Sequence, residues 1–189
     1  YEYARSALKL GLKLGKELGV NPYKFGMNAS TDTHTALPTS REENYFGKYQ
    51  HTEPSPERHD REVIPAEDPA LRIMTSQEVA SGLTAGWARE NTREAIFDAL
   101  TRKEVYATTG TRIRVRVFGG WDFTAADLAT ADFTALGYRR GVPMGGDLRN
   151  APCDKAPTLM IRALRYPDGA NLDRVQIIKG WLDADGETH

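Results

Sequence analysis

The chain has 189 residues, with 25 Lys and Arg against 26 Asp and Glu, so its formal net charge is −1 and its length suits one domain, or one domain with a smaller appendage. A single cysteine excludes a disulfide framework and a cysteine-rich zinc module. The balanced charge argues against a nucleic-acid partner or a membrane surface, and no apolar run is long enough to predict a membrane span.

The first predicted element is an amphipathic helix over residues 4–18, because apolar or small residues recur there at steps of three and four. Gly19 is placed to end this helix, and Pro22 prevents its continuation. We interpret its basic side chains as a solvated face rather than a binding surface. No N-cap residue precedes the helix, and residues 185–189 resemble the tip of a turn. We therefore expect a piece of a longer protein whose upstream half is missing.

A short strand is predicted over residues 23–29, and the polar segment 30–35 follows it. In α/β folds the loops at the carboxyl ends of strands build the active site, which makes Asp32 and His34 candidate site residues. Residues two apart in an extended segment point to the same side, so this carboxylate and imidazole are candidate ligands for Zn²⁺, Mn²⁺ or Fe. Two ligands do not complete a site. The residues alone leave open a turn carboxylate beside a surface histidine.

Residues 38–72 are predicted to form a long loop that begins close to His34. They include five prolines and fifteen charged or His residues, and they lack sustained periodicity. The loop is either a lid over the metal site or a packed surface excursion without a catalytic role. Its charged side chains at 41–43 and at Lys48 are expected to be solvated. The candidate aromatic anchors of the loop are Tyr45, Phe46 and Tyr49.

Regular structure is expected again after residue 81. A helix is predicted from an N-cap at Asn91 to about Lys103, with Glu94 completing a capping box. A strand and a Thr-Thr-Gly turn follow at residues 106–110. We interpret Trp87, which precedes the helix, as a packing residue rather than part of a pocket.

The final third of the chain predicts a small antiparallel β unit. Residues 112–118 alternate strictly, with arginines on one face and Ile113, Val115 and Val117 on the other. This pattern is typical of a half-buried strand whose arginine face is solvated or salt-bridged. Two more strands are predicted over 158–164 and 174–179. Cys153 has no histidine partner in sequence range, so we do not expect it to be a nucleophile.

Seven motifs together cover nearly the whole chain. They lie at residues 19–26, 30–35, 42–48, 87–97, 106–113, 141–148 and 176–181. In combination they resemble a bacterial family of uncharacterised proteins, a domain of unknown function related to the PHP (polymerase and histidinol phosphatase) metal-dependent hydrolases. The resemblance implies an α/β fold. Residues 1–111 would form the C-terminal part of a PHP-like distorted (β/α)7 barrel, with 38–72 inserted, and residues 112–189 a truncated antiparallel β extension.

The same resemblance implies a site and a reaction. The last metal motif of PHP domains is an Asp-x-His at a strand end, which Asp32 and His34 match, while the earlier ligands would lie upstream of residue 1. Divalent metal would activate water to hydrolyse a phosphoester, or an ester or amide, in a small-molecule substrate. Asp32 could also relay the proton. The site in this fragment would be incomplete and the fragment inactive alone. Relatives in that family are often exported, which favours the periplasm or cell envelope.

A non-catalytic module is the alternative function. In that interpretation the β unit and the glycine-bearing helix serve assembly, or carbohydrate and polymer binding.

Overall fold

The structure is a computed structural model that describes residues 3–39 and 41–189, without the side chain of Glu42. The chain divides into two compact units. Tyr1–Gly26 and Asn171–His189 make the first unit, and Met27–Ala170 make the second. Among the described helices, none is both long and apolar enough to cross a membrane. The domain boundary between residues 111 and 112 stays a prediction.

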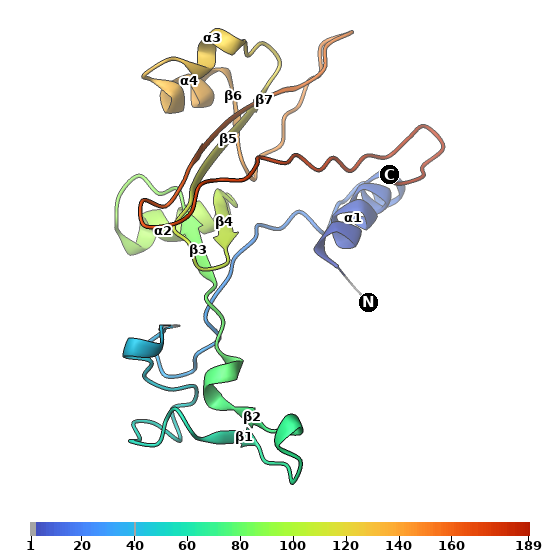
Figure 1. The fold of residues 1–189 in the computed structure, drawn as a ribbon. Helices are drawn as coiled ribbons and strands as arrows, with labels where there is room; N and C mark the ends of the chain where they lie inside the picture. Colours follow the sequence, from blue (N-terminus) through green and yellow to red (C-terminus); the bar gives the residue numbers. More distant parts are fainter. Residues whose placement is uncertain (1–2, 40) are drawn as a thin grey trace. The chain divides into compact units, whose positions relative to one another are not determined.

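The first unit is built on helix α1 (Ala4–Leu18), which confirms the helix predicted from periodicity (Figure 1). Gly19 ends the helix in the left-handed conformation, with φ 74°, and its N–H donates to the carbonyl oxygen of Gly15 at 3.1 Å. Gly11 is buried against the returning chain, because a Cβ added there would overlap the Oδ1 atom of Asn21. A glycine in the helix interior is therefore required for this close approach.

The C-terminal part of the same unit is a turn held by backbone hydrogen bonds. Trp181 and His189 exchange two of them, at 3.2 Å and 3.0 Å, and their rings stack. The ammonium group of Lys16 in α1 donates to the carbonyl oxygen of Ala184 at 3.0 Å. No strand forms over residues 174–179, so that predicted strand is wrong.

The second unit contains small antiparallel sheets and short helices. Its sheets pair β1 (Glu62–Ile64) with β2 (Ile73–Met74), β3 (Leu83–Gly86) with β4 (Val105–Thr108), and β5 (Arg114–Gly120) with both β6 (Gly141–Pro143) and β7 (Thr158–Leu164). Its helices are α2 (Arg93–Thr101), α3 (Ala125–Leu128) and α4 (Phe133–Arg140). Its 3₁₀ turns are η1 (Glu42–Asn44), η2 (Pro69–Leu71) and η3 (Thr75–Glu78).

The predicted (β/α)7 barrel is wrong. Within the described residues there is no closed barrel and no repeating strand–helix pattern. Helix α2 connects β3 to β4, yet these strands pair antiparallel, with Leu83 opposite Thr108 and Gly86 opposite Val105. A barrel of the expected kind needs parallel neighbours joined by helical crossovers. The strand predicted over 23–29 is also absent, so the fold is mixed α/β with little regular structure.

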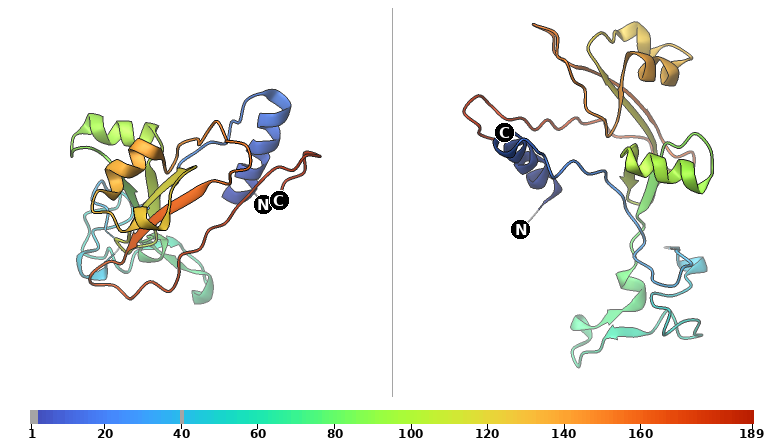
Figure 2. Two further views of the ribbon diagram at one scale, coloured as in Figure 1. Left: turned by 90° about the horizontal axis from the view of Figure 1, so that it is seen from above. Right: turned by 180° about the vertical axis from the view of Figure 1, so that it is seen from behind.

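An antiparallel sheet does occupy the final third of the chain, as the alternating pattern predicts. Strand β5 pairs with β7 along its length, from Arg114 opposite Leu164 to Gly120 opposite Thr158. Helix α4 packs against β5 and β6 (Figure 2). The strand predicted over 158–164 coincides with β7.

The apolar core of this unit lies between the sheet and α4. Phe118, Phe123, Phe133 and Met160 form it, and the rings of Phe118 and Phe133 meet edge to face with centroids 5.7 Å apart. Gly137 lets α4 approach, because a Cβ added at this position would overlap the Phe118 ring.

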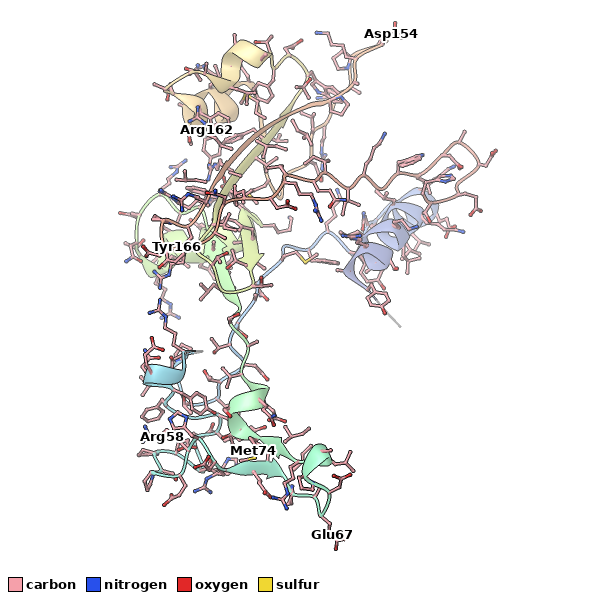
Figure 3. All side chains as sticks on the ribbon, viewed as in Figure 1. Arg58, Glu67, Met74, Asp154, Arg162 and Tyr166 are labelled. Carbon is pink, nitrogen blue, oxygen red and sulfur yellow. The ribbon has the colours of Figure 1, made fainter. Side chains whose placement is uncertain are left out.

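Arg162 of β7 joins the sheet to the end of α3 and to the residues after it (Figure 3). Its Nη2 atom donates to the carbonyl oxygens of Leu128 at 2.8 Å and Thr130 at 3.0 Å. Its guanidinium lies 4.3 Å from the centroid of the Phe133 ring. The side chain therefore covers the core from one side while its charge is satisfied by backbone oxygens.

The more buried face of β5 is the face that carries arginine. Arg116 and Phe118 are buried, whereas Val115 and Val117 on the other face are half-buried. The Nη2 atom of Arg116 lies 2.8 Å from Oε1 of Glu104, whose side chain is fully buried. The expected salt bridge on this face is confirmed at Arg116, but the apolar residues do not face the core as the alternation implied.

Candidate functional site

The segment that carries Asp32 and His34 is anchored to residues that lie about 50 positions later in the chain. The Ala29 N–H donates to Oγ1 of Thr84 at 3.0 Å, and that hydroxyl donates to the Ala29 carbonyl oxygen at 2.7 Å. The Thr31 carbonyl oxygen accepts a bond from the Ala80 N–H at 3.0 Å. These bonds fix the backbone directly before Asp32, although no strand forms there.

Asp32 is not in the extended conformation that sequence reasoning assumed. Its φ is 60°, in the left-handed region that Asp tolerates better than most residues. The argument that residues two apart point to one side therefore does not apply to this segment. The contacts of Asp32 with later parts of the chain set its direction instead.

Lys48 makes the strongest of these contacts. Its ammonium group donates to the Asp32 carbonyl oxygen at 2.7 Å, to Asp32 Oδ2 at 2.6 Å, and to the Glu78 carbonyl oxygen at 2.9 Å. A lysine ammonium has three donors, so all of them are used. The Lys48 side chain is only 2% exposed, while that of Asp32 is 67% exposed. The expectation that Lys48 is solvated is wrong.

His34 is held by the same stretch of the loop. Its N–H donates to the Lys48 carbonyl oxygen at 2.8 Å, which makes an isolated parallel bridge with Tyr49. The rings of His34 and Tyr49 stack with centroids 5.4 Å apart. The Tyr49 hydroxyl donates to Glu78 Oε2 at 2.8 Å, and this bond to a carboxylate, followed by burial, raises the pKa of Tyr49.

The charges around Asp32 favour its ionised form. The hydrogen bond from Lys48 and its positive charge hold the pKa of Asp32 below the ordinary value of 3.8, His34 lowers it further, and burial opposes these effects. The carboxylate is therefore negatively charged near neutral pH. An anionic oxygen close to an imidazole is a donor pair suited to a divalent metal.

The pair does not make a complete metal site by itself. In the part of the chain that the structure describes, no group of three or more His, Cys, Asp or Glu side chains is placed to hold an ion. Lys48 engages Oδ2 of Asp32, whose side chain as a whole remains 67% exposed. The pair supplies two donors of types that divalent metals bind, and at least one more protein ligand is needed.

Among the described residues, no hydrogen bond or ring contact joins the other histidines directly to this pair; His51 is linked to His34 through the ring of Tyr49, which lies against both. His51 lies against Tyr49, with ring centroids 5.4 Å apart, and His59 against Tyr45 at 5.5 Å. His189 bonds Asp183 in the first unit. The aromatic anchoring expected for the 38–72 loop is therefore observed at Tyr45, which is buried, and at Tyr49.

Sequence reasoning missed Lys48, Tyr49 and Glu78 as the residues that hold Asp32 and His34. Lys48 lies 16 positions from Asp32 and 30 from Glu78, so no local spacing connects them. A faint indication is that Lys48 stands in an aromatic-rich stretch, 45–49, where a purely solvated lysine is less expected.

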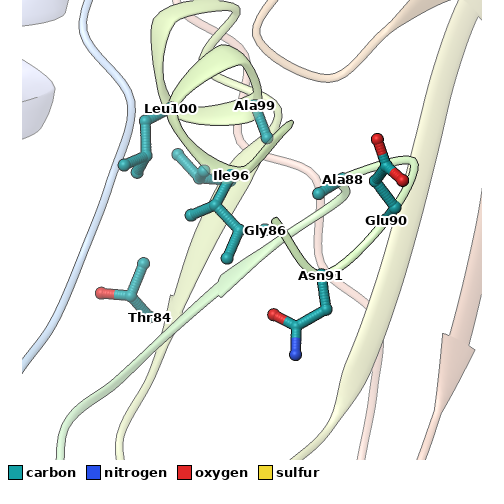
Figure 4. A pocket seen from close by; sticks show the side chains of 9 residues that line it. Thr84, Gly86, Ala88, Glu90, Asn91, Ile96, Ala99 and Leu100 are labelled. Atoms are coloured by element: carbon teal, nitrogen blue, oxygen red, sulfur yellow. The ribbon is translucent and has the colours of Figure 1, made fainter. Parts of the chain in front are cut away.

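A separate apolar pocket lies between β3, β4 and α2 (Figure 4). It encloses about 590 Å³ and is lined by Thr84, Gly86, Ala88, Glu90, Asn91, Ile96, Ala99, Leu100 and Val105. Neither Asp32 nor His34 lines it. Trp87 does not line it either, and its Nε1 atom donates to the Val115 carbonyl oxygen at 3.0 Å, in agreement with the packing role expected for it.

Helix α2 beside this pocket begins one residue after the predicted position. Thr92 is its N-cap, because its Oγ1 atom accepts a bond from the Ala95 N–H at 3.3 Å. Asn91, the predicted cap, instead lines the pocket.

Comparison with known proteins gives one result. No curated protein and no solved structure matches the chain. Residues 1–189 match the family described as "Protein of unknown function (DUF3604)". This match confirms the uncharacterised family that the motifs indicate, whereas the relation to PHP hydrolases stays a prediction. Because the match spans the whole sequence, the chain belongs to the DUF3604 family.

Proposed function

We propose that the chain is part of a metal-dependent hydrolase in which Asp32 and His34 are two of the metal ligands. The observation that supports this proposal best is that Lys48 holds both residues, because its ammonium bonds the Asp32 carboxylate at 2.6 Å and its carbonyl oxygen accepts the His34 N–H at 2.8 Å. Such a carboxylate and imidazole pair is chemically suited to Zn²⁺, Mn²⁺ or Fe. The PHP-like Asp-x-His motif gives the same assignment from sequence.

The chemistry that a divalent metal supplies in such a site is activation of water for hydrolysis of a phosphoester, or of an ester or amide. Asp32 contributes an anionic oxygen, and His34 contributes a ring nitrogen. We propose Asp32 also as the residue that relays the proton. We propose that the third ligand comes from a residue outside the described surroundings of the pair. The small-molecule substrate would bind at the completed site.

A titration with Mn²⁺ tests this assignment, because paramagnetic broadening of amide NMR signals detects even weak binding at an incomplete site. Broadening should centre on residues 31–35 and should be lost in Asp32→Asn and in His34→Ala. His59→Ala is the matched control and should behave like the wild type. Broadening spread over the acidic surface, or unchanged in both site variants, would contradict the proposal.

Hydrolysis assays then choose the reaction class. The full-length protein that contains these residues should hydrolyse p-nitrophenyl phosphate or an acyl ester faster with added Mn²⁺ or Zn²⁺, and Asp32→Asn should abolish the difference. Equal rates with and without metal in the wild type would contradict hydrolysis by metal-activated water.

A non-catalytic assembly module is the second candidate, and the first unit carries the observation that favours it. Several leucines of α1 are exposed, with Leu10 at 44% and Leu18 at 70%, and the apolar residues Val175 and Ile177 in the same unit are 58% and 56% exposed. Apolar surface of this kind often contacts another protein surface. Light scattering after size exclusion tests this candidate, which predicts an oligomer that dissociates in Leu10→Glu.

A further inference from the structure

We propose that Lys48 is the positioning residue of the Asp32–His34 pair, an inference that rests on the proposed function. Lys48 holds both residues at once. Its carbonyl oxygen accepts the His34 N–H at 2.8 Å, and its ammonium donates to the Asp32 carboxylate at 2.6 Å. One loop residue therefore sets the backbone of one ligand and the side chain of the other.

The burial of Lys48 makes this arrangement specific. A buried ammonium is unfavourable unless acceptors surround it, and here three oxygens do so at 2.6–2.9 Å. Moving Asp32 would leave two of these donors without partners. The carboxylate is consequently fixed through Oδ2.

Glu78 accepts hydrogen bonds from both Lys48 and Tyr49. Its carbonyl oxygen accepts a bond from Lys48, and its Oε2 atom accepts one from the hydroxyl of Tyr49, whose ring stacks on His34. Lys48 and Tyr49 are thus tied to η3 and to the candidate ligands together. Groups that orient metal ligands in this way typically change metal affinity about 10- to 100-fold when they are removed.

A simple charge effect predicts the opposite sign. If Lys48 only neutralised Asp32, then removing it would strengthen metal binding, because a competing positive charge would disappear. If Lys48 positions Asp32, then removing it should weaken metal binding. The direction of the change therefore distinguishes the two roles.

The experiment is the Mn²⁺ titration followed by amide NMR, with Lys48→Met, which keeps the aliphatic stem and removes the charge. The Mn²⁺ concentration that half-broadens the signals of residues 31–35 should rise about 10- to 100-fold. Lys155→Met is the matched control, since it removes an exposed lysine paired with Asp122, and it should leave that concentration unchanged. Unshifted signals for β5 and β7 establish that their sheet is folded, and unshifted signals for Ala80 and Thr84, which bond the backbone before Asp32, establish that this segment stays in place.

Lys48→Arg supplies a second test, used if Lys48→Met does not fold. It keeps the positive charge but changes the donor geometry. A loss of Mn²⁺ affinity of at least tenfold in the variant used supports positioning, and an equal or higher affinity overturns it while leaving the proposed function intact. Absence of site-centred broadening in the wild type overturns the proposed function, and the assignment of Lys48 with it.

Discussion

The buried ion pair of Glu104 and Arg116 gives the most quantitative prediction about stability. Arg116→Met removes the cation that lies 2.8 Å from Glu104, where the two side chains are 7% and 0% exposed. The Tyr138 hydroxyl still donates to Glu104 Oε1 at 2.6 Å, and Arg102 still lies 3.3 Å from Oε2. The substitution therefore leaves a buried carboxylate with weaker compensation.

Breaking a buried pair from one side typically costs about 3–5 kcal/mol. The remaining contacts of Glu104 place the expected loss at the lower end, about 3 kcal/mol. For a chain of this size that corresponds to a fall in Tm of about 6 to 12 °C. The guanidinium also lies 4.4 Å from the centroid of the Trp87 ring, and the loss of this cation–π contact acts in the same direction.

Urea unfolding followed by tryptophan fluorescence and by circular dichroism measures this loss. Arg139→Met is the control, because it removes an exposed arginine from α4 and should change the free energy of unfolding by less than about 0.5 kcal/mol. The double variant Arg116→Met with Glu104→Gln should recover more than half of the loss, since no unpaired charge is then buried. A single variant as stable as the wild type, or a double variant less stable than the single one, would refute this reasoning.

Two further predictions concern Tyr49 and Gly137. Because the pKa of Tyr49 is raised, its bond to Glu78 stabilises the fold below pH 10.0, and this contribution is lost as the pH rises through the shifted pKa. In an ultraviolet titration, the wild type should therefore show one late-ionising tyrosine that Tyr49→Phe lacks. Gly137→Ala should lower the free energy of unfolding by about 1–3 kcal/mol in thermal unfolding, because the added Cβ overlaps the Phe118 ring. Gly169→Ala, where a Cβ meets only ordinary contacts, is its control, and equal stability of the two variants would contradict the overlap.

Local elements were predictable where one short pattern decides them. Alternation identified β5, and the three- and four-residue steps together with Gly19 identified α1 and its end. The pairing of the strands was not predictable in this way, because β3 and β4 meet across about twenty residues and nothing local specifies an antiparallel partner. The family resemblance predicted a barrel, and the antiparallel pairing of β3 with β4 excludes it for the described residues.

The candidate site was predictable only in its motif. Asp32 and His34 stand out because a carboxylate and an imidazole are two residues apart. Their conformation could not be derived from the sequence, because Asp32 has φ 60° instead of an extended backbone. The direction of its side chain is set by the bond from Lys48 and not by the alternation of a strand. That contact depends on how the loop folds back, and Glu78, which completes it, comes from η3.

Lys48 and Arg116 share one physical cause for their unexpected burial. In each case a carboxylate from another segment compensates the buried charge, Asp32 for Lys48 and Glu104 for Arg116, and Arg116 shares its face of β5 with the buried Phe118. The buried apolar side chains of the described chain are few for its length, namely Tyr45, Ala99, Val105, Phe118, Phe123, Phe133 and Met160.

The two ion pairs nevertheless differ in what can replace them. A buried pair often contributes little net stability compared with apolar residues of the same shape, so Glu104 and Arg116 together are replaceable in principle by a packed apolar pair. Asp32 and Lys48 are not, because the Asp32 side chain is exposed and its charge is the property that the proposed ligand role requires. An apolar pair at 32 and 48 would therefore abolish Mn²⁺ binding and also remove the bonds that Lys48 donates to the backbone oxygens of Asp32 and Glu78, whereas one at 104 and 116 would leave Mn²⁺ binding unchanged.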